Sequence, residues 1–174
     1  PRDEDRGGGT VSQINFGCVN RFRQTDGRAK PAKRGRSQRE GKSMRYDFEL
    51  VGKIGSMALI RREDADIDYN IFSRLGSELK PGMIWVTSGA AEIGRLDYIK
   101  RTGHELTCDS VDAKTDYAAQ GQSILMQNYR QFIHQEYGVR QLLVEHTHFN
   151  DPEKREHIRR LLIRAAQQKT IPIV

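Results

Sequence analysis

Two short segments combine small residues with charged or hydroxyl side chains, the residue types that bind phosphate and carboxylate groups. The first is VGKIGSMAL (residues 51–59), where Lys53 is followed by Gly55 and Ser56. Small residues let backbone N–H groups approach an anion, and an ammonium group neutralises charge on phosphoryl oxygens. The segment is not a P-loop, because GxxxxGK[ST] is absent. A strand-ending Lys-x-Gly also occurs in ordinary turns, so this pattern alone leaves both interpretations open.

The second segment is VTSGAAEIG (residues 86–94), where Ser88 and Gly89 precede a predicted helix that begins near Ala90. The N-terminus of a helix carries unpaired N–H groups and a partial positive charge, which favour a carboxylate or phosphate in front of it. The helix dipole contributes about 1 kcal/mol, enough to assist binding without defining a substrate. The alternative is that Ser88 simply caps the helix.

Strands and helices alternate in the sequence around these two segments. Apolar runs predict strands at residues 46–54, 83–89, 139–146 and 171–174. Helical spacing of apolar residues predicts helices at residues 67–79, from 90, at 112–137 and at 153–169. We expect Asp66 to cap the first helix, Gly138 to end the third, and Asp151 with Pro152 to begin the fourth.

This alternation predicts an α/β fold: a three-layer sandwich with a mainly parallel open sheet between helices. Ligands of such sheets bind at the carboxyl ends of the strands. Lys53, Gly55 and Ser56 follow the first predicted strand, and Ser88 to Ala90 follow the second. Both segments therefore fall at the expected ligand-binding edge.

The net charge of +6 comes from residues 1–43, which hold 11 Lys and Arg against 5 Asp and Glu. Their composition predicts disorder. They could be a solvated tail, a tag or mis-called upstream region, or a nucleic-acid-binding arm. The remainder is neutral on balance, so we expect no nucleic-acid partner for the folded part. No apolar run approaches a membrane span and no signal-peptide pattern occurs, so we expect no membrane contact and a cytoplasmic location.

Several short motifs follow one another along residues 46–174. In chain order they are KIGS, VTSGA, a GQ-containing helix with ILMQNYRQFI, YGVR, a strand ending before HFND, and IPIV. This ordered set resembles the N-terminal half of glutamate 5-kinases, members of the amino acid kinase family. Each motif is weak by itself, and the specificity lies in their order.

The resemblance implies an ATP-dependent phosphotransferase that uses ATP and Mg²⁺ to phosphorylate the side-chain carboxylate of glutamate, or a similar small carboxylate, to an acyl phosphate. With glutamate, the reaction belongs to proline biosynthesis. By motif match, Lys53 would stabilise the transferring phosphoryl group, with Gly55 and Ser56 donating N–H groups to it. Ser88, Gly89 and Ala90 would hold the acceptor. The family also implies a homo-oligomer.

Two departures from the family pattern bear on this interpretation. His157 stands where the family has a substrate-binding asparagine, so we assign His157 to the substrate site and treat glutamate as the leading candidate only. The family's nucleotide half would follow Val174, so we expect residues 44–174 to be an acceptor-binding part that lacks kinase activity alone.

Two alternatives share the predicted fold. A nucleotide monophosphate kinase of the uridylate type would carry a glycine triplet in the second segment, whereas SGA with a downstream GQ favours a carboxylate acceptor. A non-catalytic, anion-binding or oligomeric relative would hold anions without turnover. We expect no metal site at His146 and His148, because no third ligand accompanies them at suitable spacing.

Overall fold

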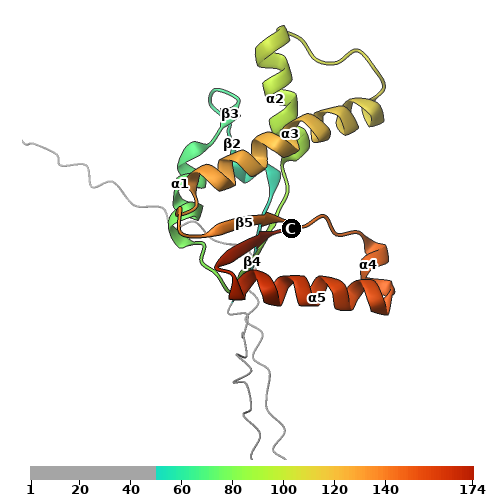
Figure 1. The fold of residues 1–174 in the computed structure, drawn as a ribbon. Coiled ribbons are helices and arrows are strands. Elements are labelled where there is room, and N and C mark those ends of the chain that lie inside the picture. Colours follow the sequence, from blue (N-terminus) through green and yellow to red (C-terminus); the bar gives the residue numbers. More distant parts are fainter. Residues whose placement is uncertain (1–49) are drawn as a thin grey trace, which may run out of the picture.

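A computed structural model describes residues 50–174. The predictions for residues 1–43, and the start of the first predicted strand at residues 46–49, lie outside this range. The predicted α/β class is confirmed: a four-stranded parallel sheet has helices packed against it (Figure 1). Within the described residues, no helix is both long and apolar enough to cross a membrane.

The main sheet has the strand order β1-β4-β6-β5, and all three pairings are parallel. The strands are β1 (Leu50–Ile54), β4 (Met83–Thr87), β5 (Gly138–Gln141) and β6 (Thr170–Ile173). β6 is therefore an inner strand, buried along its whole length, and it separates β4 from β5. The carboxyl ends of the four strands lie at one edge of the sheet, where the C label stands in Figure 1.

Within residues 50–174, five α-helices and one 3-10 helix connect the strands. Their bounds are η1 (Ser56–Leu59), α1 (Tyr69–Glu78), α2 (Ala90–Thr102), α3 (Ser110–Phe132), α4 (His146–Asn150) and α5 (Pro152–Gln167). α2 and α3 form a closely packed pair, and α1 packs against α3. α3 lies on one side of the sheet and α5 on the other (Figure 1). The chain passes from β4 to β5 in one direction across the sheet and returns to β6 in the other. Because both crossovers are right-handed, α5 lies on the opposite face of the sheet from α3.

Two predicted helix boundaries are wrong, each for a local reason. Asp68, not Asp66, caps α1, because the preceding Ile67 pairs with Ile60 in a short hairpin. Gly138 does not end α3, which stops at Phe132. Instead, Gly138 starts β5, where a Cβ atom would lie 2.6 Å from the Thr170 hydroxyl of β6.

The strand predicted at residues 139–146 is shorter than expected. β5 ends at Gln141, and the Leu142 N–H makes one further bond to the Ile173 carbonyl at 2.8 Å. The chain then leaves the sheet, and Glu145 and His148 form a reciprocal capping box that begins α4. The apolar run therefore contains a buried Leu142 and a Leu143 that is 75% exposed.

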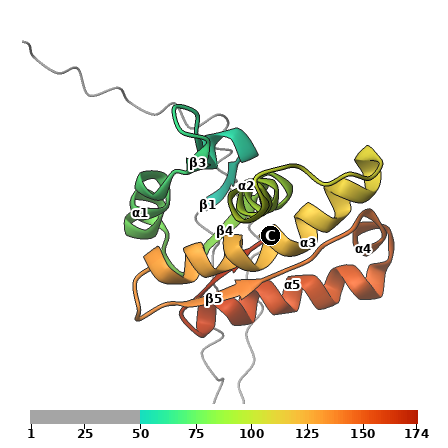
Figure 2. The same ribbon diagram turned by 90° about the horizontal axis from the view of Figure 1, so that it is seen from above.

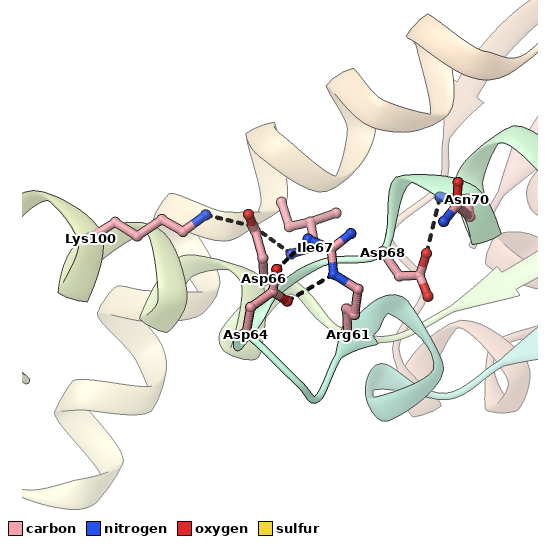
Figure 3. Close-up of polar contacts among 7 residues, drawn as sticks. All are labelled: Arg61, Asp64, Asp66, Ile67, Asp68, Asn70 and Lys100. Atoms are coloured by element: carbon pink, nitrogen blue, oxygen red, sulfur yellow. Dashed lines mark hydrogen bonds and ion pairs between the residues drawn. The ribbon is translucent and has the colours of Figure 1, made fainter.

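The short hairpin of β2 (Ile60–Arg61) and β3 (Asp66–Ile67) has no counterpart among the predictions, because two-residue strands show no periodicity. Arg61 donates to both carboxylate oxygens of Asp64, at 2.8 and 2.5 Å. Lys100 of α2 lies 2.5 Å from Asp66 (Figure 3). The hairpin lies beyond the β1 edge of the sheet, on the side opposite α5 (Figure 2).

The hydrophobic core lies between the sheet and the layer of α1 and α3. Phe72 of α1 meets the ring of Tyr129 edge-on, with ring centres 5.2 Å apart. Trp85 of β4 packs over Gly52 of β1, where a Cβ atom would lie 2.1 Å from the indole. This core holds the carboxyl ends of β1 and β4 side by side beneath α3.

Candidate functional site

A cavity of about 150 Å³ opens at the carboxyl edge of the sheet, among the ends of β4, β5 and β6. Its lining residues are Thr87, Ser88, Gly89, Ala90, Gln122, Leu125, Gln141, Leu142, Leu143, Ile173 and Val174. The second predicted segment, Ser88 to Ala90, therefore lies in its wall. The cavity lies beyond the strand ends, the position at which ligands of parallel sheets usually bind.

The first turn of α2 faces this cavity without a side-chain cap. Gly89 occupies the N-cap position with φ of 113°, a conformation that glycine adopts without strain. No side chain of residues 50–174 caps the helix at this position. The first N–H groups of α2 are thus available to an anion, at an end of the helix where the dipole is positive.

Ser88 does not cap α2, so the simpler interpretation of this serine is wrong. Its hydroxyl donates to the Ile54 carbonyl at 3.2 Å, and its N–H donates to the same oxygen at 3.3 Å. Both bonds join the end of β4 to the end of β1. Ser88 therefore connects the two predicted segments.

Gly89 brings the same two segments into contact. A Cβ atom at Gly89 would lie 3.2 Å from Leu59 Cδ1 and 3.5 Å from Ser56 Cα. Ser56 is the first residue of η1, and Gly55 caps that helix without a side chain. The structure thus places Gly55 and Ser56 beside the N-terminus of α2, although neither lines the cavity.

Lys53 lies on β1 opposite Val86 of β4, and its side chain is exposed. Side chains alternate along a strand, so Lys53 is on the opposite face from Ile54, which enters the core beneath α3. Lys53 does not line the cavity. It makes no ion pair with another residue of the described range.

Two glycines set how closely α2 and α3 approach. A Cβ atom at Gly94 would lie 1.9 Å from the Tyr117 carbonyl oxygen, and one at Gly121 would lie 1.9 Å from the Ala90 carbonyl oxygen. Only a residue without a side chain fits at these two crossings. The contact holds α3 against the first turn of α2 and places Gln122 in the cavity wall.

Gln122 and Gln141 also line the cavity, and neither was predicted as a site residue. Gln122 belongs to the GQ pair, which was a family motif without a stated role. Gln141 lies at the end of β5, within a strand that was expected to continue to residue 146. Its position at the cavity depends on where that strand ends.

His157 is exposed on α5 and does not line the cavity. Its assignment to substrate binding stays a prediction. No ionisable side chain lines the cavity, and the two hydroxyls in its wall, those of Thr87 and Ser88, already donate to the carbonyls of Ser88 and Ile54. Among residues 50–174, no group of three or more His, Cys, Asp or Glu side chains could hold a metal ion.

A buried tyrosine lies directly behind the cavity wall. Tyr129 of α3 donates to the hydroxyl of Thr87 at 2.8 Å and accepts from the indole of Trp85 at 3.0 Å. Burial raises the pKa of Tyr129 above its ordinary value, and the two hydrogen bonds oppose that shift only in part. The hydroxyl of Tyr129 therefore stays protonated at neutral pH.

In comparisons with known proteins, no family model matches the chain, and no curated protein matches it.

Proposed function

We propose that residues 50–174 form the acceptor- and phosphate-binding part of an ATP-dependent kinase of small carboxylates, similar to the glutamate 5-kinases. One observation carries this proposal. The uncapped N-terminus of α2 opens into a cavity at the carboxyl edge of a parallel sheet, and the η1 segment packs beside it. Two anion-binding segments at one sheet edge suit a reaction that joins a carboxylate to a phosphoryl group.

In this proposal the acceptor carboxylate binds in front of α2, where the N–H groups of Ala90 and its neighbours donate to it. Gln122 and Gln141 add neutral donors and acceptors for the remaining polar groups of the substrate. Leu125, Leu142 and Ile173 supply apolar contacts for its carbon chain. A small cavity with a few polar groups on an apolar base is typical of a small-molecule site.

The phosphoryl group would lie on the η1 side, near the backbone of Gly55 and Ser56. Lys53 is two residues before Gly55, and its exposed, flexible side chain would neutralise charge on the transferring group. A carboxylate oxygen attacks the γ-phosphorus of ATP, the bond to the β-phosphate oxygen breaks, and an acyl phosphate and ADP result. Positioning and charge neutralisation supply most of the catalysis in such transfers.

The size of the cavity favours a small carboxylate over a nucleotide as the acceptor. Its volume of about 150 Å³ is below the roughly 300–1,000 Å³ of pockets that hold drug-sized ligands. A nucleoside monophosphate would need space beyond these walls. The volume therefore supports the carboxylate kinase against the uridylate-type alternative.

The proposal is tested by titrating the full chain with glutamate, other small dicarboxylates and inorganic phosphate, and following amide resonances by NMR. We expect a carboxylate to shift the resonances of Ser88, Gly89 and Ala90. Lys53→Gln should weaken phosphate binding about tenfold, the effect of losing one charge-assisted contact. Lys80→Gln is the matched control, because Lys80 is also exposed but precedes β4 at the opposite edge of the sheet.

The absence of binding by every carboxylate and by phosphate would contradict the proposal. Phosphoryl transfer is measured in the same mixture with Mg-ATP and hydroxylamine, which traps an acyl phosphate as a hydroxamate. Hydroxamate formation identifies a working kinase. Binding without hydroxamate is the result expected of an acceptor-binding part that lacks the nucleotide half, and equally of a non-catalytic relative.

A further inference from the structure

A chain of three hydrogen bonds runs from the core to the cavity wall. The indole N–H of Trp85 bonds to the Tyr129 hydroxyl at 3.0 Å, which bonds to the Thr87 hydroxyl at 2.8 Å. The Thr87 hydroxyl in turn bonds to the Ser88 carbonyl at 3.1 Å. Trp85 and Tyr129 are 5% and 1% exposed, so water does not compete for the first bond. We refer to Trp85, Tyr129 and Thr87 as the relay.

The direction of every bond in the relay follows from its first member. An indole N–H can only donate, so the Tyr129 oxygen must accept from Trp85. The single proton of Tyr129 is then free to be donated to Thr87, and the proton of Thr87 to the Ser88 carbonyl. Because each hydroxyl accepts one bond and donates the next, neighbouring bonds strengthen one another.

The last bond fixes a peptide group in the cavity wall. The Ser88 carbonyl is held by Thr87, and the planar trans peptide points the Gly89 N–H in the opposite direction. Within residues 50–174, that N–H makes no hydrogen bond to another residue. Gly89 has no side chain to restrict rotation of this peptide, so its orientation depends on what holds the Ser88 carbonyl.

We propose that Tyr129, acting through Thr87, is a positioning residue that sets the orientation of the Ser88–Gly89 peptide for an anion bound before α2. The inference rests on the proposed function for the identity of that anion. Tyr129 does not itself line the cavity, whereas Thr87 does. A preorganised N–H avoids the free-energy cost of ordering the loop when the ligand binds.

Tyr117 provides a matched control on the same helix. Its ring is also buried, and its hydroxyl accepts a hydrogen bond from the Leu106 N–H at 2.7 Å. That bond belongs to the loop between α2 and α3 and leads to no cavity residue. Each of the variants Tyr117→Phe and Tyr129→Phe removes one hydroxyl oxygen. Tyr117→Phe loses one partly buried hydrogen bond, whereas Tyr129→Phe loses two hydrogen bonds and breaks the relay.

The experiment compares Tyr129→Phe, Thr87→Val, the double variant, Thr87→Ser and Tyr117→Phe in the full chain. The probes are glutamate affinity and the Gly89 amide resonance of the free protein. We expect Tyr129→Phe and Thr87→Val each to weaken binding about tenfold, as the loss of one positioned hydrogen bond does. The double variant should be no weaker than either single variant. Thr87→Ser should keep the wild-type affinity.

An equal loss of affinity in Tyr117→Phe, or additive losses in the double variant, would overturn the proposal, because either result indicates general destabilisation. The Gly89 resonance separates this proposal from the proposed function. One possible result is that the wild-type protein binds no anion, while Tyr129→Phe and Thr87→Val shift the Gly89 resonance and Thr87→Ser leaves it unchanged. In that case the relay positions the peptide, and the kinase assignment fails. An unshifted resonance in both variants rejects the relay regardless of binding.

Discussion

At the residue scale, two aspartates of one short segment have different partners. Asp68 caps α1 by accepting from the N–H groups of Asn70 and Ile71, at 3.0 and 3.3 Å. Asp66 instead accepts from Lys100 of α2 and from the Ile67 N–H, at 2.5 and 2.6 Å (Figure 3). Both residues are aspartates, a residue type that suits an N-cap, so residue type alone could not show which of them caps α1.

Asp68→Ala should lower the free energy of unfolding by about 1 kcal/mol, because two first-turn N–H groups of α1 lose their acceptor. Urea denaturation followed by circular dichroism measures this change. The matched control is Asp116→Ala, which removes an exposed aspartate that lies within α3 and caps no helix. Equal losses in the two variants would show that Asp68 contributes no cap.

At the scale of elements, the pairing of α2 with α3 decides the shape of the cavity. Gly121 lies against the Ala90 carbonyl and the Gly94 N–H, so the first turn of α2 and the middle of α3 touch backbone to backbone. α3 then presents Gln122 and Leu125 to the cavity on one side. Tyr129 of the same helix donates a hydrogen bond to Thr87, so the relay lies beside this contact.

Gly121→Ala should destabilise the protein by at least about 2 kcal/mol, because its Cβ would lie 1.9 Å from one backbone atom and 2.4 Å from another. An exposed glycine in a helix would show the opposite sign, since alanine is the better helix former. Gln127→Ala, at an exposed position of the same helix, is the control and should change stability little. An unchanged midpoint for Gly121→Ala would disprove the close crossing.

At the scale of the whole molecule, several carboxylates are held in their charged form by the fold. Lys100 lowers the pKa of Asp66 and Arg61 lowers that of Asp64, through hydrogen bonds to their side chains. Backbone N–H groups lower the pKa of Asp109 and Asp151, which cap α3 and α5. These groups lie in different parts of the chain, so their effect on stability is a property of the whole fold.

Because these folded-state pKa values are depressed, the stabilisation is fully present above the unfolded value of about 4 and is lost as pH falls through the folded values. We expect the free energy of unfolding to decline below about pH 4. Asp66→Asn should lower the free energy of unfolding at neutral pH. In this variant, that free energy should also fall less steeply as the pH is lowered. Denaturation curves at a series of pH values measure both effects, and a steeper decline in Asp66→Asn would contradict the assignment.

The local sequence pattern was sufficient to predict much of this fold. Helical and strand periodicity predicted the α/β class and the order of the main elements, and Asp151 with Pro152 correctly marked the start of α5. Ser88, Gly89 and Ala90 were predicted from the strand-to-helix transition, and all three line the cavity. These features depend on neighbouring residues, whose types and spacing are visible in the sequence.

Only the tertiary structure decided what surrounds those three residues. It placed β6 between β4 and β5, turned Lys53 to the face opposite the core, and brought Gln122 and Gln141 to one cavity. It also joined Tyr129 to Thr87 across 42 positions of the chain. These relations arise from packing between distant segments, which leaves no periodic signal. The sequence by itself therefore determined where α2 begins, and the packing of β6 and α3 decided the walls of the cavity.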